Sequence, residues 1–452
     1  MSGERRSGQK RVLARMGKFM SSSWHVPGDE AGNPSRRAMI AYNVVANVHA
    51  NLVGGNFFTG LLIALQADDA FVGLVTMLTF GANLLQMFTP FLLERFTRRK
   101  PVLIAARILI HLVNVAFIGA IPYLPAAWQQ RLVMLGFSVF LVNALGAFIG
   151  PGVAVWHIAH IPPQVRVQYF SMVTMLNGIF IALFNLLGSG VVDSFRSGGR
   201  ELLGLTVLRV FAFVLAAVDI FLLTRIKELP APKPAKPVRL RALLVEPWRH
   251  PDYLRSVLVI LLWSFVANMP GSFYTVYLLR ELGVSYSYIM AVNAFNVVVL
   301  TALTFAWRKV FLKHNWLKPL GVAVLAFAPH YVALSFVSRD LLFLYPVAII
   351  WSFVCLSGIN LAFSSVAFIN IPHVNQTQYV GFFWTANFLG AFAAASLSRA
   401  FVTGFHTLRF TLLGVPFGEK QLLMLIVGFL MAGVGLAILR VAKTNIRKGL
   451  EH

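Results

Sequence analysis

The chain has 452 residues, of which 58% are hydrophobic and 12% are charged, and its mean hydropathy is +0.73. A water-soluble protein carries charge on about a quarter of its residues, so this composition excludes soluble enzymes, disordered chains and disulfide scaffolds and predicts a protein whose surface faces lipid. The net charge of +23 is typical either of nucleic-acid binding or of basic loops on the cytoplasmic side of a membrane, and its distribution along the chain decides between them.

Residues 1–37 are polar and basic and lack the apolar core of a signal peptide, so we interpret them as a cytoplasmic tail. A membrane-spanning helix needs about 20 mostly apolar residues. Twelve segments have this character: 38–65, 69–93, 101–122, 132–158, 168–192, 202–224, 255–279, 286–310, 319–337, 341–368, 378–402 and 421–440.

The longest break between these segments, 225–254, begins with a Pro-rich and basic sequence that cannot lie in hydrocarbon and is predicted to be a cytoplasmic linker. It divides the predicted spans into six and six. We therefore expect an N-terminal six-helix bundle over 38–224, a C-terminal six-helix bundle over 255–441 and a cytoplasmic tail over 442–452.

The basic residues are distributed unevenly between the two sides of the predicted membrane. If both termini lie in the cytoplasm, the cytoplasmic segments carry 29 Lys and Arg residues and the opposite side carries 8. This asymmetry is the positive-inside pattern of membrane proteins. It accounts for the basic charge without nucleic acid and predicts an integral protein of the plasma (inner) membrane with both termini cytoplasmic.

The two halves of the chain resemble each other. GGNFFTGLLIAL at 54–65 parallels PGSFYTVYLLRE at 270–281, and IPPQVRVQYFSMVTMLN at 161–177 parallels IPHVNQTQYVGFFWTAN at 371–387. Six spans separate the halves, so both begin on the same side of the membrane. The sequence thus predicts an all-α polytopic membrane protein with two parallel, pseudo-symmetric bundles around a cavity that opens alternately to each side.

The loop PFLLERFTRRK at 90–100 resembles the signature loop of the major facilitator superfamily, which runs Gly, three residues, Asp-Arg, one residue, Gly-Arg-Arg-Lys. Glu94 stands at the acidic position. The basic positions are held by Arg95, Arg98, Arg99 and Lys100. The resemblance covers about 38–441 and implies that superfamily's fold of about twelve transmembrane helices, although Pro90 and Thr97 replace the two glycines.

In that superfamily the signature loop latches the two bundles together near the cytoplasmic face. The resemblance therefore implies a conformational latch made of Glu94, Arg95, Arg98, Arg99 and Lys100. An ion pair that forms in only one state biases a two-state equilibrium. The alternative interpretation is that the basic cluster only keeps the loop on the cytoplasmic side.

The resemblance also implies that the first, second, fourth and fifth spans of each half line the cavity. Thirteen asparagines lie on these spans, whereas only Asn114 lies on a peripheral span. Asn43, Asn47 and Asn51 recur every fourth residue and so share one helix face. These residues predict a hydrogen-bonding lumen, although asparagines also join helices to one another in membranes.

Aromatic residues on the spans are further candidates for contact with a ring-shaped or apolar solute. Trp263, Trp351 and Trp384 qualify, although a tryptophan in a span more commonly packs or anchors at the interface. The predicted substrate-binding residues are Asn43, Asn47, Asn51, Trp263, Asn268, Asn293, Asn296, Trp384 and Asn387.

Asp219 is the one carboxylate clearly inside a predicted span. A lone charge in a membrane is costly, so we expect it to pair with Arg107. Asp219 is either a structural partner of the latch or a site of proton coupling. His49, on the first span, is the second candidate for proton coupling because histidine titrates near neutral pH.

The sequence contains no motif for ATP, metal or cofactor binding. We therefore expect no cofactor and no enzymatic activity, and predict a monomeric secondary active transporter. Its partners would be a small, neutral polar or amphipathic organic solute, the lipid bilayer, and a coupling proton or cation. The alternatives are a flippase for a lipid-linked precursor on the same fold, a membrane enzyme acting on lipid-borne substrates, and a transporter-like receptor that carries no flux.

Overall fold

The computed structural model describes residues 24–89, 96, 98–229, 246–313, 316–366 and 376–447. The first half forms the helices α2 (Asn33–Val53), α3 (Gly55–Ala64), α4 (Asp69–Asn83), η1 (Leu84–Phe88), α6 (Lys100–His111), η2 (Leu112–Phe117), α7 (Ile118–Ala120), η3 (Ile121–Tyr123), α8 (Trp128–Ala159), α9 (Pro163–Ser197) and α10 (Glu201–Arg225).

The second half forms η4 (Glu246–Arg249), α12 (Pro251–Asn268), α13 (Phe273–Val276), η5 (Tyr277–Glu281), α14 (Tyr286–Lys313), α15 (Leu317–Ser335), α16 (Leu344–Val366), α17 (Gln376–Gly404) and α18 (Glu419–Arg447). Between α17 and α18, the strands β1 (Phe410–Leu412) and β2 (Val415–Phe417) form an antiparallel hairpin.

Each of the twelve predicted spans coincides with a helix or a run of helices. Several helices extend beyond the predicted ends, as α9 does over Pro163–Ser197, because hydropathy marks only the part of a helix that lies in hydrocarbon. Ten helices or helix runs of the described segments are long and apolar enough to cross a membrane. The two other predicted spans correspond to α2 with α3 and to α14.

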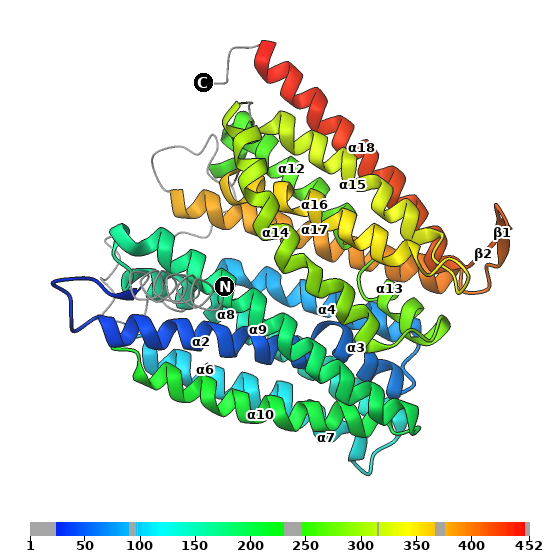
Figure 1. The fold of residues 1–452 in the computed structure, drawn as a ribbon, viewed down its shortest axis with the longest axis horizontal. Helices are drawn as coiled ribbons and strands as arrows, with labels where there is room; N and C mark the ends of the chain where they lie inside the picture. Colours follow the sequence, from blue (N-terminus) through cyan, green and yellow to red (C-terminus); the bar gives the residue numbers. More distant parts are fainter. Residues whose placement is uncertain are drawn as a thin grey trace, which may run out of the picture.

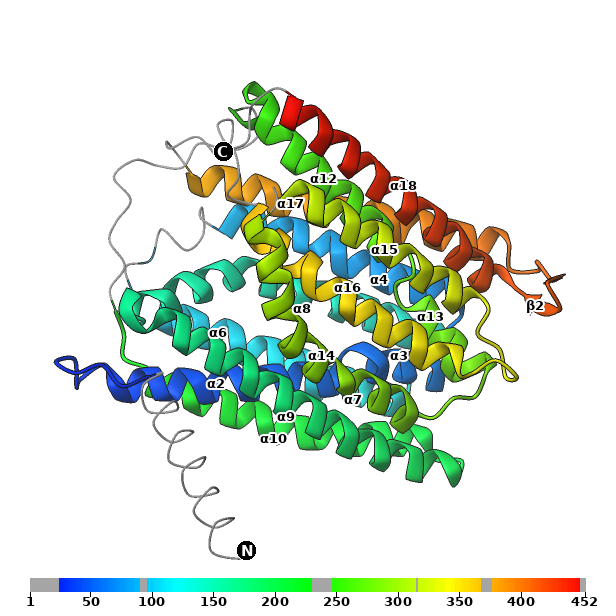
Figure 2. The same ribbon diagram turned by 45° about the horizontal axis from the view of Figure 1, so that its top comes forward.

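The helices form two bundles that lie one above the other in both views (Figures 1 and 2). The bundles meet where α9 packs on α14 and α4 packs on α17. Helix α2 begins and helix α18 ends at the same end of the molecule, which we call the terminal face; the β1–β2 hairpin lies at the opposite end, the loop face (Figure 1). The two-bundle architecture predicted from the repeat is confirmed.

The first long helix of each half is broken, and the breaks match. Gly55, which follows α2, has φ +50°, and Gly271, which follows α12, has φ +46°. Residues that have a side chain rarely adopt this left-handed backbone conformation, whereas glycine adopts it without strain. The two glycines are 216 residues apart, the spacing at which GGNFFTGLLIAL parallels PGSFYTVYLLRE. The repeat therefore preserves a helix break.

The start of α2 is held by a buried arginine. Arg36 is 1% exposed, and it donates from Nη1 to Asp29 Oδ2 (2.7 Å), from Nε to the Trp24 carbonyl (2.8 Å) and from Nη2 to Asn33 Oδ1 (2.6 Å). The Arg36 guanidinium beside Asp29 lowers the pKa of that carboxyl below its ordinary value. These contacts fix residues 24–33 against the terminal end of the first bundle.

Candidate functional site

A cavity of about 380 Å³ lies beside the break between α12 and α13. Asn56 of the first bundle and Asn268, Thr275 and Asn293 of the second line it. The Thr275 hydroxyl donates to Asn56 Oδ1 at 2.9 Å, so the cavity is closed on one side by a hydrogen bond between the bundles. Its volume falls in the range of small-molecule sites.

The cavity wall offers hydrogen bonds and aromatic rings without formal charge. Its lining residues, as described by the structure, include no Asp, Glu, Lys or Arg. Asn268 Nδ2 donates to the Ser264 carbonyl at 2.7 Å, which leaves its amide oxygen for another donor. The buried Tyr274 hydroxyl has no hydrogen-bond partner within the described part of the chain. Since buried polar groups are nearly always paired, this hydroxyl indicates a place for water or a ligand.

Tyr274 also belongs to a group of rings at this wall. Its ring stacks on Tyr345 with centroids 6.3 Å apart, and Tyr345 lies 5.9 Å from Tyr288. From α15 come His330, whose Nδ1 is 2.8 Å from the Ala348 carbonyl, and Tyr331. Helix α15 corresponds to the ninth predicted span, which the family resemblance places at the periphery of the second bundle. The cavity therefore reaches deeper into that bundle than the sequence predicts.

The structure brings two of the predicted substrate-binding residues, Asn268 and Asn293, to this cavity. Asn296 lies one turn further along α14. Asn43, Asn47 and Asn51 form a continuous ladder on α2, in which each side-chain amide donates to the carbonyl four residues earlier at 2.8–2.9 Å. Their amide oxygens therefore point away from the backbone, but these three residues do not line the cavity beside α12.

The predicted tryptophans lie in three different environments. Trp263 packs inside the second bundle, 5.7 Å from the Phe327 ring and 5.8 Å from the Phe363 ring. Trp384 is 39% exposed, and Trp351 is 44% exposed and donates from Nε1 to the Ala326 carbonyl at 2.7 Å. None of the three lines the cavity described above. Asn387 contributes its carbonyl, which accepts from Ser264 Oγ at 2.7 Å.

A second polar site is buried in the first bundle around Asp219, which is fully buried on α10. Asp219 Oδ2 accepts from Arg107 Nε at 2.9 Å, as the sequence predicts, and lies 2.6 Å from His111 Nε2. Asp219 Oδ1 and His111 Nδ1 have no hydrogen-bond partner among the described residues. The carboxylate and the guanidinium balance each other, so one added proton would leave this buried cluster with a net positive charge.

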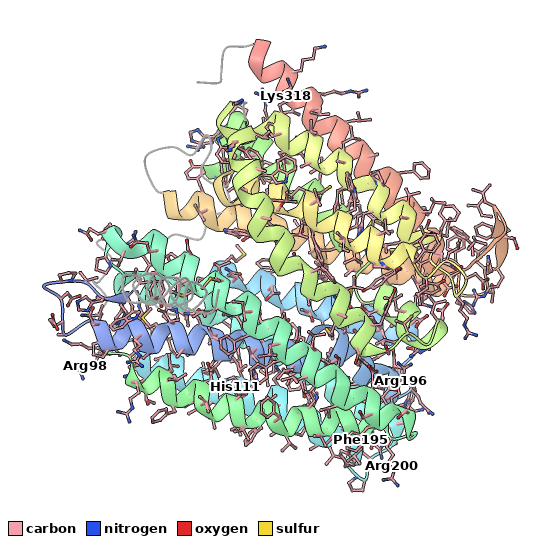
Figure 3. All side chains as sticks on the ribbon, in the orientation of Figure 1. Arg98, His111, Phe195, Arg196, Arg200 and Lys318 are labelled. Carbon is pink, nitrogen blue, oxygen red and sulfur yellow. The ribbon has the colours of Figure 1, made fainter. Side chains whose placement is uncertain are left out.

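His49 extends this cluster to α2. Its ring meets the His111 ring edge-on with centroids 4.5 Å apart, and its Nε2 is buried without a partner in the described segments. Figure 3 shows His111 between the two ends of the first bundle, far from Arg98 and from Arg196. The two histidines therefore link the buried carboxylate to the helix that carries the asparagine ladder.

Arg209, the other cation inside a predicted span, has a structural role. It donates to the Asn114 carbonyl in the π-helix η2 at 2.7 Å and to the Val53 carbonyl at the end of α2 at 3.3 Å. The last carbonyls of a helix lack intrahelical partners and carry partial negative charge. Arg209 thus stabilises the break between α2 and α3.

Ion pairs join the two bundles at the loop face. Asp69 at the start of α4 lies 3.0 Å from Arg280 Nη1 and 2.6 Å from Lys420 Nζ. Lys420, which is 4% exposed, also lies 2.6 Å from Glu281 Oε1 and 2.8 Å from Glu419 Oε1. Two cations of the second bundle therefore converge on one carboxylate of the first.

A second group of contacts crosses the same face between α9 and α14. Arg196 donates to the carbonyls of Val284 and Leu279 at 2.9 and 2.8 Å. Asp193 accepts from the Tyr286 amide at 2.9 Å, where its charge also favours the N-terminus of α14. The Tyr286 hydroxyl donates to Glu201 at 2.7 Å. In the structure the bundles are fastened together at the loop face.

The latch residues make a different kind of contact. The amides of Arg99 and Lys100 donate to the Glu228 carboxylate at 3.3 and 3.1 Å, and Lys100 Nζ donates to the carbonyls of Thr224 and Ile226. These contacts lie within the first bundle. Arg98 is exposed at the terminal face (Figure 3), and Glu94 and Arg95 lie outside the described residues.

The loop-face contacts were not predicted from the sequence. In the sequence, Arg196, Arg280 and Lys420 are three of the 8 basic residues on the side predicted to lie opposite the cytoplasm. Basic residues are rare on that side of the membrane because the positive-inside pattern disfavours them there. Their presence was therefore the one sequence feature that could have indicated ion pairs at the loop face. Asp69, which pairs with Arg280 and Lys420, and Glu281, which pairs with Lys420, have no distinguishing pattern in the sequence.

Comparisons with known proteins agree with the geometry. The family described as Major Facilitator Superfamily matches residues 44–395. No curated protein matches the chain in sequence. One solved structure with a similar fold is that of the nucleoside transporter NupG, with 12% identity, coverage of 90% of this chain and 98% of that chain, and a TM-score of 0.62. Another is that of a D-xylose-proton symporter, with 11% identity, coverage of 89% of this chain and 96% of that chain, and a TM-score of 0.63. A bacterial homolog of the human lysosomal transporter Spinster, in an inward-facing and occupied conformation, matches with 17% identity, 91% and 97% coverage and a TM-score of 0.63. At these identities the likeness concerns the fold alone.

Proposed function

Because the chain belongs to the major facilitator superfamily, we propose that it is a secondary active transporter that moves a small, neutral polar or amphipathic organic solute by alternating access. The observation that carries this proposal is the cavity beside α12, which lies in the second bundle and is met by Asn56 of the first; its described lining holds amides, hydroxyls and aromatic rings and no formal charge. A charged solute would need a countercharge there. Neutral hydrogen-bonding groups and tyrosine rings suit a ring-shaped polar solute.

The transport cycle we propose places the terminal face in the cytoplasm of a plasma (inner) membrane. The excess of basic residues on that side supports this orientation. The contacts of Asp69 with Arg280 and Lys420 close the loop face, and they support our proposal that this state opens toward the cytoplasm. Release of these pairs would accompany opening to the other side, with Glu94, Arg95 and Arg99 closing the cytoplasmic face in turn.

We further propose that the buried cluster of Asp219, His111 and Arg107 takes up and releases the coupling proton. A carboxylate removed from water beside an imidazole can hold a proton in one conformation and lose it in another. His49 connects this cluster to α2 through its ring contact with His111. In this proposal a change of charge at the cluster shifts α2, which ends at the Gly54–Gly55 break and carries the asparagines predicted to line the lumen.

The cavity can be tested by shortening Tyr274 and Asn293 separately. We expect Tyr274→Phe and Asn293→Ala each to weaken solute binding about tenfold, the effect of losing one hydrogen bond in a buried site. The measurement is the thermal shift of the purified protein with the solute that a metabolite screen identifies. Asn114→Ala, on a peripheral span, is the matched control and should bind as the parent does. Unchanged binding by both cavity variants would exclude this cavity as the site.

The asparagine ladder on α2 gives a second test. In a Cys355→Ala background, we expect Asn47→Cys to react with a small aqueous thiol reagent, because a thiolate forms readily only where water reaches it. Val214→Cys, at a position 56% exposed on the outer side of α10, should stay unreactive because that side faces hydrocarbon. If Asn47→Cys resists labelling in every state, the ladder does not line a wet lumen.

Reconstitution separates transport from the alternatives. Proteoliposomes that accumulate the identified solute support the proposal. Movement of a fluorescent lipid between leaflets, without solute accumulation, would support a flippase. Specific binding with neither kind of flux would support a receptor.

A further inference from the structure

A groove runs along the outside of the first bundle between α2, α9 and α10. Its apolar part has a volume of about 450 Å³ and is lined by Val44, Val45 and Val48 of α2, Met172 and Phe184 of α9, and Leu215 of α10. The three helices pack on one another, and Figure 1 shows α2 between α9 and α10. The groove therefore has α2 as its floor.

The groove opens toward the hydrocarbon of the bilayer. Next to it, Leu187 of α9 is 58% exposed and Phe211 of α10 is 41% exposed, and the Phe184 ring stacks on the Phe211 ring with centroids 5.8 Å apart. Large exposed apolar side chains on a transmembrane bundle face lipid. An occupant of the groove would therefore enter from the membrane.

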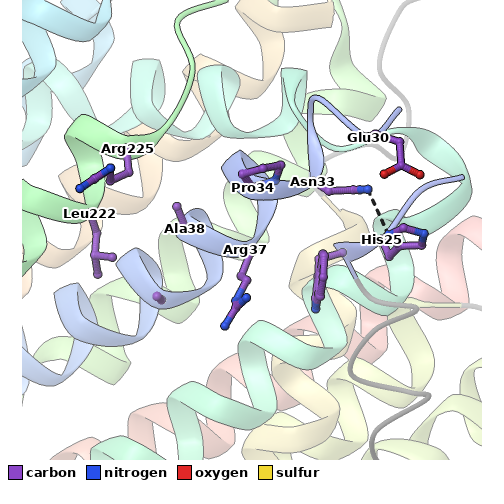
Figure 4. A pocket seen from close by; sticks show the side chains of 10 residues that line it. His25, Glu30, Asn33, Pro34, Arg37, Ala38, Leu222 and Arg225 are labelled. Carbon is purple, nitrogen blue, oxygen red and sulfur yellow. Dashed lines mark hydrogen bonds between the residues drawn. The ribbon is translucent and has the colours of Figure 1, made fainter. Parts of the chain in front are cut away.

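At the terminal face the groove continues into a larger and more polar cavity of about 850 Å³. Trp24, Arg37 and Ala41 line both cavities, so the two are continuous. The polar cavity is also lined by Arg225, at the end of α10, and by His25 and Glu30. In the view of Figure 4, Arg37 lies between Arg225 on one side and His25 with Glu30 on the other.

The two arginines of the polar cavity differ from their neighbour Arg36. Arg36 forms an ion pair with Asp29, whereas neither Arg37 nor Arg225 forms an ion pair with a carboxylate of the described residues. Arg225 lies over the Phe221 ring, 4.8 Å from its centroid. Two unpaired guanidiniums at the headgroup level of a membrane favour an anion such as phosphate.

The length of the groove matches one leaflet. From Arg37 to Val48 the floor rises about 16 Å along α2, at about 1.5 Å per residue. Half of a hydrocarbon core of about 30 Å is about 15 Å. A molecule whose phosphate lies between Arg37 and Arg225 would thus bring an acyl chain of ordinary length to the end of the groove. Trp24, at the junction, has the amphipathic ring typical of the membrane interface.

From this combination of charge, apolar lining and length, we propose that the groove is a binding site for an anionic phospholipid of the leaflet at the terminal face. The headgroup phosphate binds Arg37 and Arg225, and one acyl chain lies on α2 between α9 and α10. The site is separate from the solute cavity beside α12. Because the floor is the helix that carries the asparagine ladder and the Gly54–Gly55 break, an occupying lipid would stabilise the position of α2.

Native mass spectrometry of the full-length protein can test the site by counting retained phosphatidylglycerol and phosphatidylcholine. We expect the parent protein to retain phosphatidylglycerol preferentially. The double variant Arg37→Gln/Arg225→Gln should lose this preference by about thirtyfold, the effect of two basic residues near a membrane surface. The matched control Arg131→Gln/Arg200→Gln removes two cations near the loop face and should retain the preference. Equal retention of phosphatidylglycerol by the parent and the Arg37→Gln/Arg225→Gln protein would overturn the proposal.

A second variant tests the acyl chain. Ala41→Trp fills the junction of the two cavities without changing charge, and we expect it to displace phosphatidylglycerol while leaving the thermal unfolding of the protein cooperative. If Ala41→Trp fails to fold, Val45→Phe narrows the groove with a smaller side chain and is expected to act in the same direction. Inorganic phosphate should not compete with the lipid. Competition by phosphate, or full retention of lipid by a folded groove variant, would show a surface anion site in place of a lipid groove.

Discussion

Proton-driven uptake is expected to fall to the level of protein-free vesicles when Asp219 is replaced by asparagine. The asparagine side chain keeps the shape of Asp219 but cannot carry the negative charge that holds Arg107 and attracts a proton to His111. Solute binding should persist, because the cavity beside α12 lies in the other bundle. The measurement is uptake of the identified solute into proteoliposomes under an imposed pH gradient, together with its binding by thermal shift.

The same variant should also lose stability, and this must be separated from the loss of coupling. Removing one partner of a buried ion pair costs about 3 to 5 kcal/mol, since the other charge is left without compensation. The double variant Asp219→Asn/Arg107→Gln removes both charges and should recover much of that loss. If Asp219 couples protons, driven uptake stays absent in the double variant although stability returns.

A recovery of driven uptake together with stability would show that Asp219 is only a structural partner of Arg107. Asp340→Asn provides the control for loss of one carboxylate, since Asp340 is exposed at the loop face and should change neither property. Driven uptake by a folded Asp219→Asn protein at the parent rate would refute proton coupling at this residue.

Opening of the loop face is expected to follow from Asp69→Asn. This change removes the carboxylate of the first bundle that contacts both Arg280 and Lys420 in the described structure. Lys420 is buried but Asp69 and Arg280 are partly exposed, so loss of this carboxylate is expected to cost about 1 kcal/mol, which corresponds to a shift of about fivefold in the population of the closed state. Labelling of a Ser272→Cys reporter with a membrane-impermeant thiol reagent, in a Cys355→Ala background, measures this population.

Asp68→Asn is a closely matched control. Asp68 is exposed, caps the start of α4 by accepting from the Phe71 amide at 2.7 Å, and asparagine caps helices about as well as aspartate. It removes the same charge one residue away without breaking a contact between the bundles. We expect the reporter in this variant to be labelled as slowly as in the parent.

A steric change should open the same face without altering charge. A Cβ atom at Gly60 would lie 1.7 Å from the Tyr286 hydroxyl, so Gly60→Ala forces α3 and α14 apart. Gly190→Ala, where a Cβ meets nothing within 4 Å, is its control. If both Asp69→Asn and Gly60→Ala leave Ser272→Cys unlabelled, the loop-face contacts do not hold the state that the structure represents.

The repeat illustrates how far the sequence reaches. The parallel between 54–65 and 270–281 predicted two similar halves, and the structure shows that the second residue of each segment, Gly55 or Gly271, is a glycine with positive φ. The constant spacing of matching residues predicted that the two halves are similar, but it did not predict that the first long helix of each half is broken. The break between α12 and α13 places Asn268 and Tyr274 at the cavity. This consequence of the repeat could be found only from the tertiary structure.

The asparagines show where prediction from the sequence was less specific than the structure. Their concentration on the eight predicted lining spans predicted a polar interior, yet only Asn56, Asn268 and Asn293 of the asparagines meet at the described cavity. Asn43, Asn47 and Asn51 share a helix face as predicted, but which element that face meets depends on the rotation of α2. Helix rotation is set by packing against α9 and α10, and periodicity within one helix does not report it.

The sequence by itself determined the membrane location, the number of spans, the two similar halves and the superfamily. These follow from local properties, because about 20 apolar residues in a row must lie in lipid wherever the rest of the chain goes. The tertiary structure decided which polar residues meet. Asp219 finds Arg107 and His111 across 112 and 108 residues of chain, and Asp69 meets Lys420 across the bundle interface. Such pairs depend on how several helices pack together, since each buried charge is stable only where the other helices bring a partner to it.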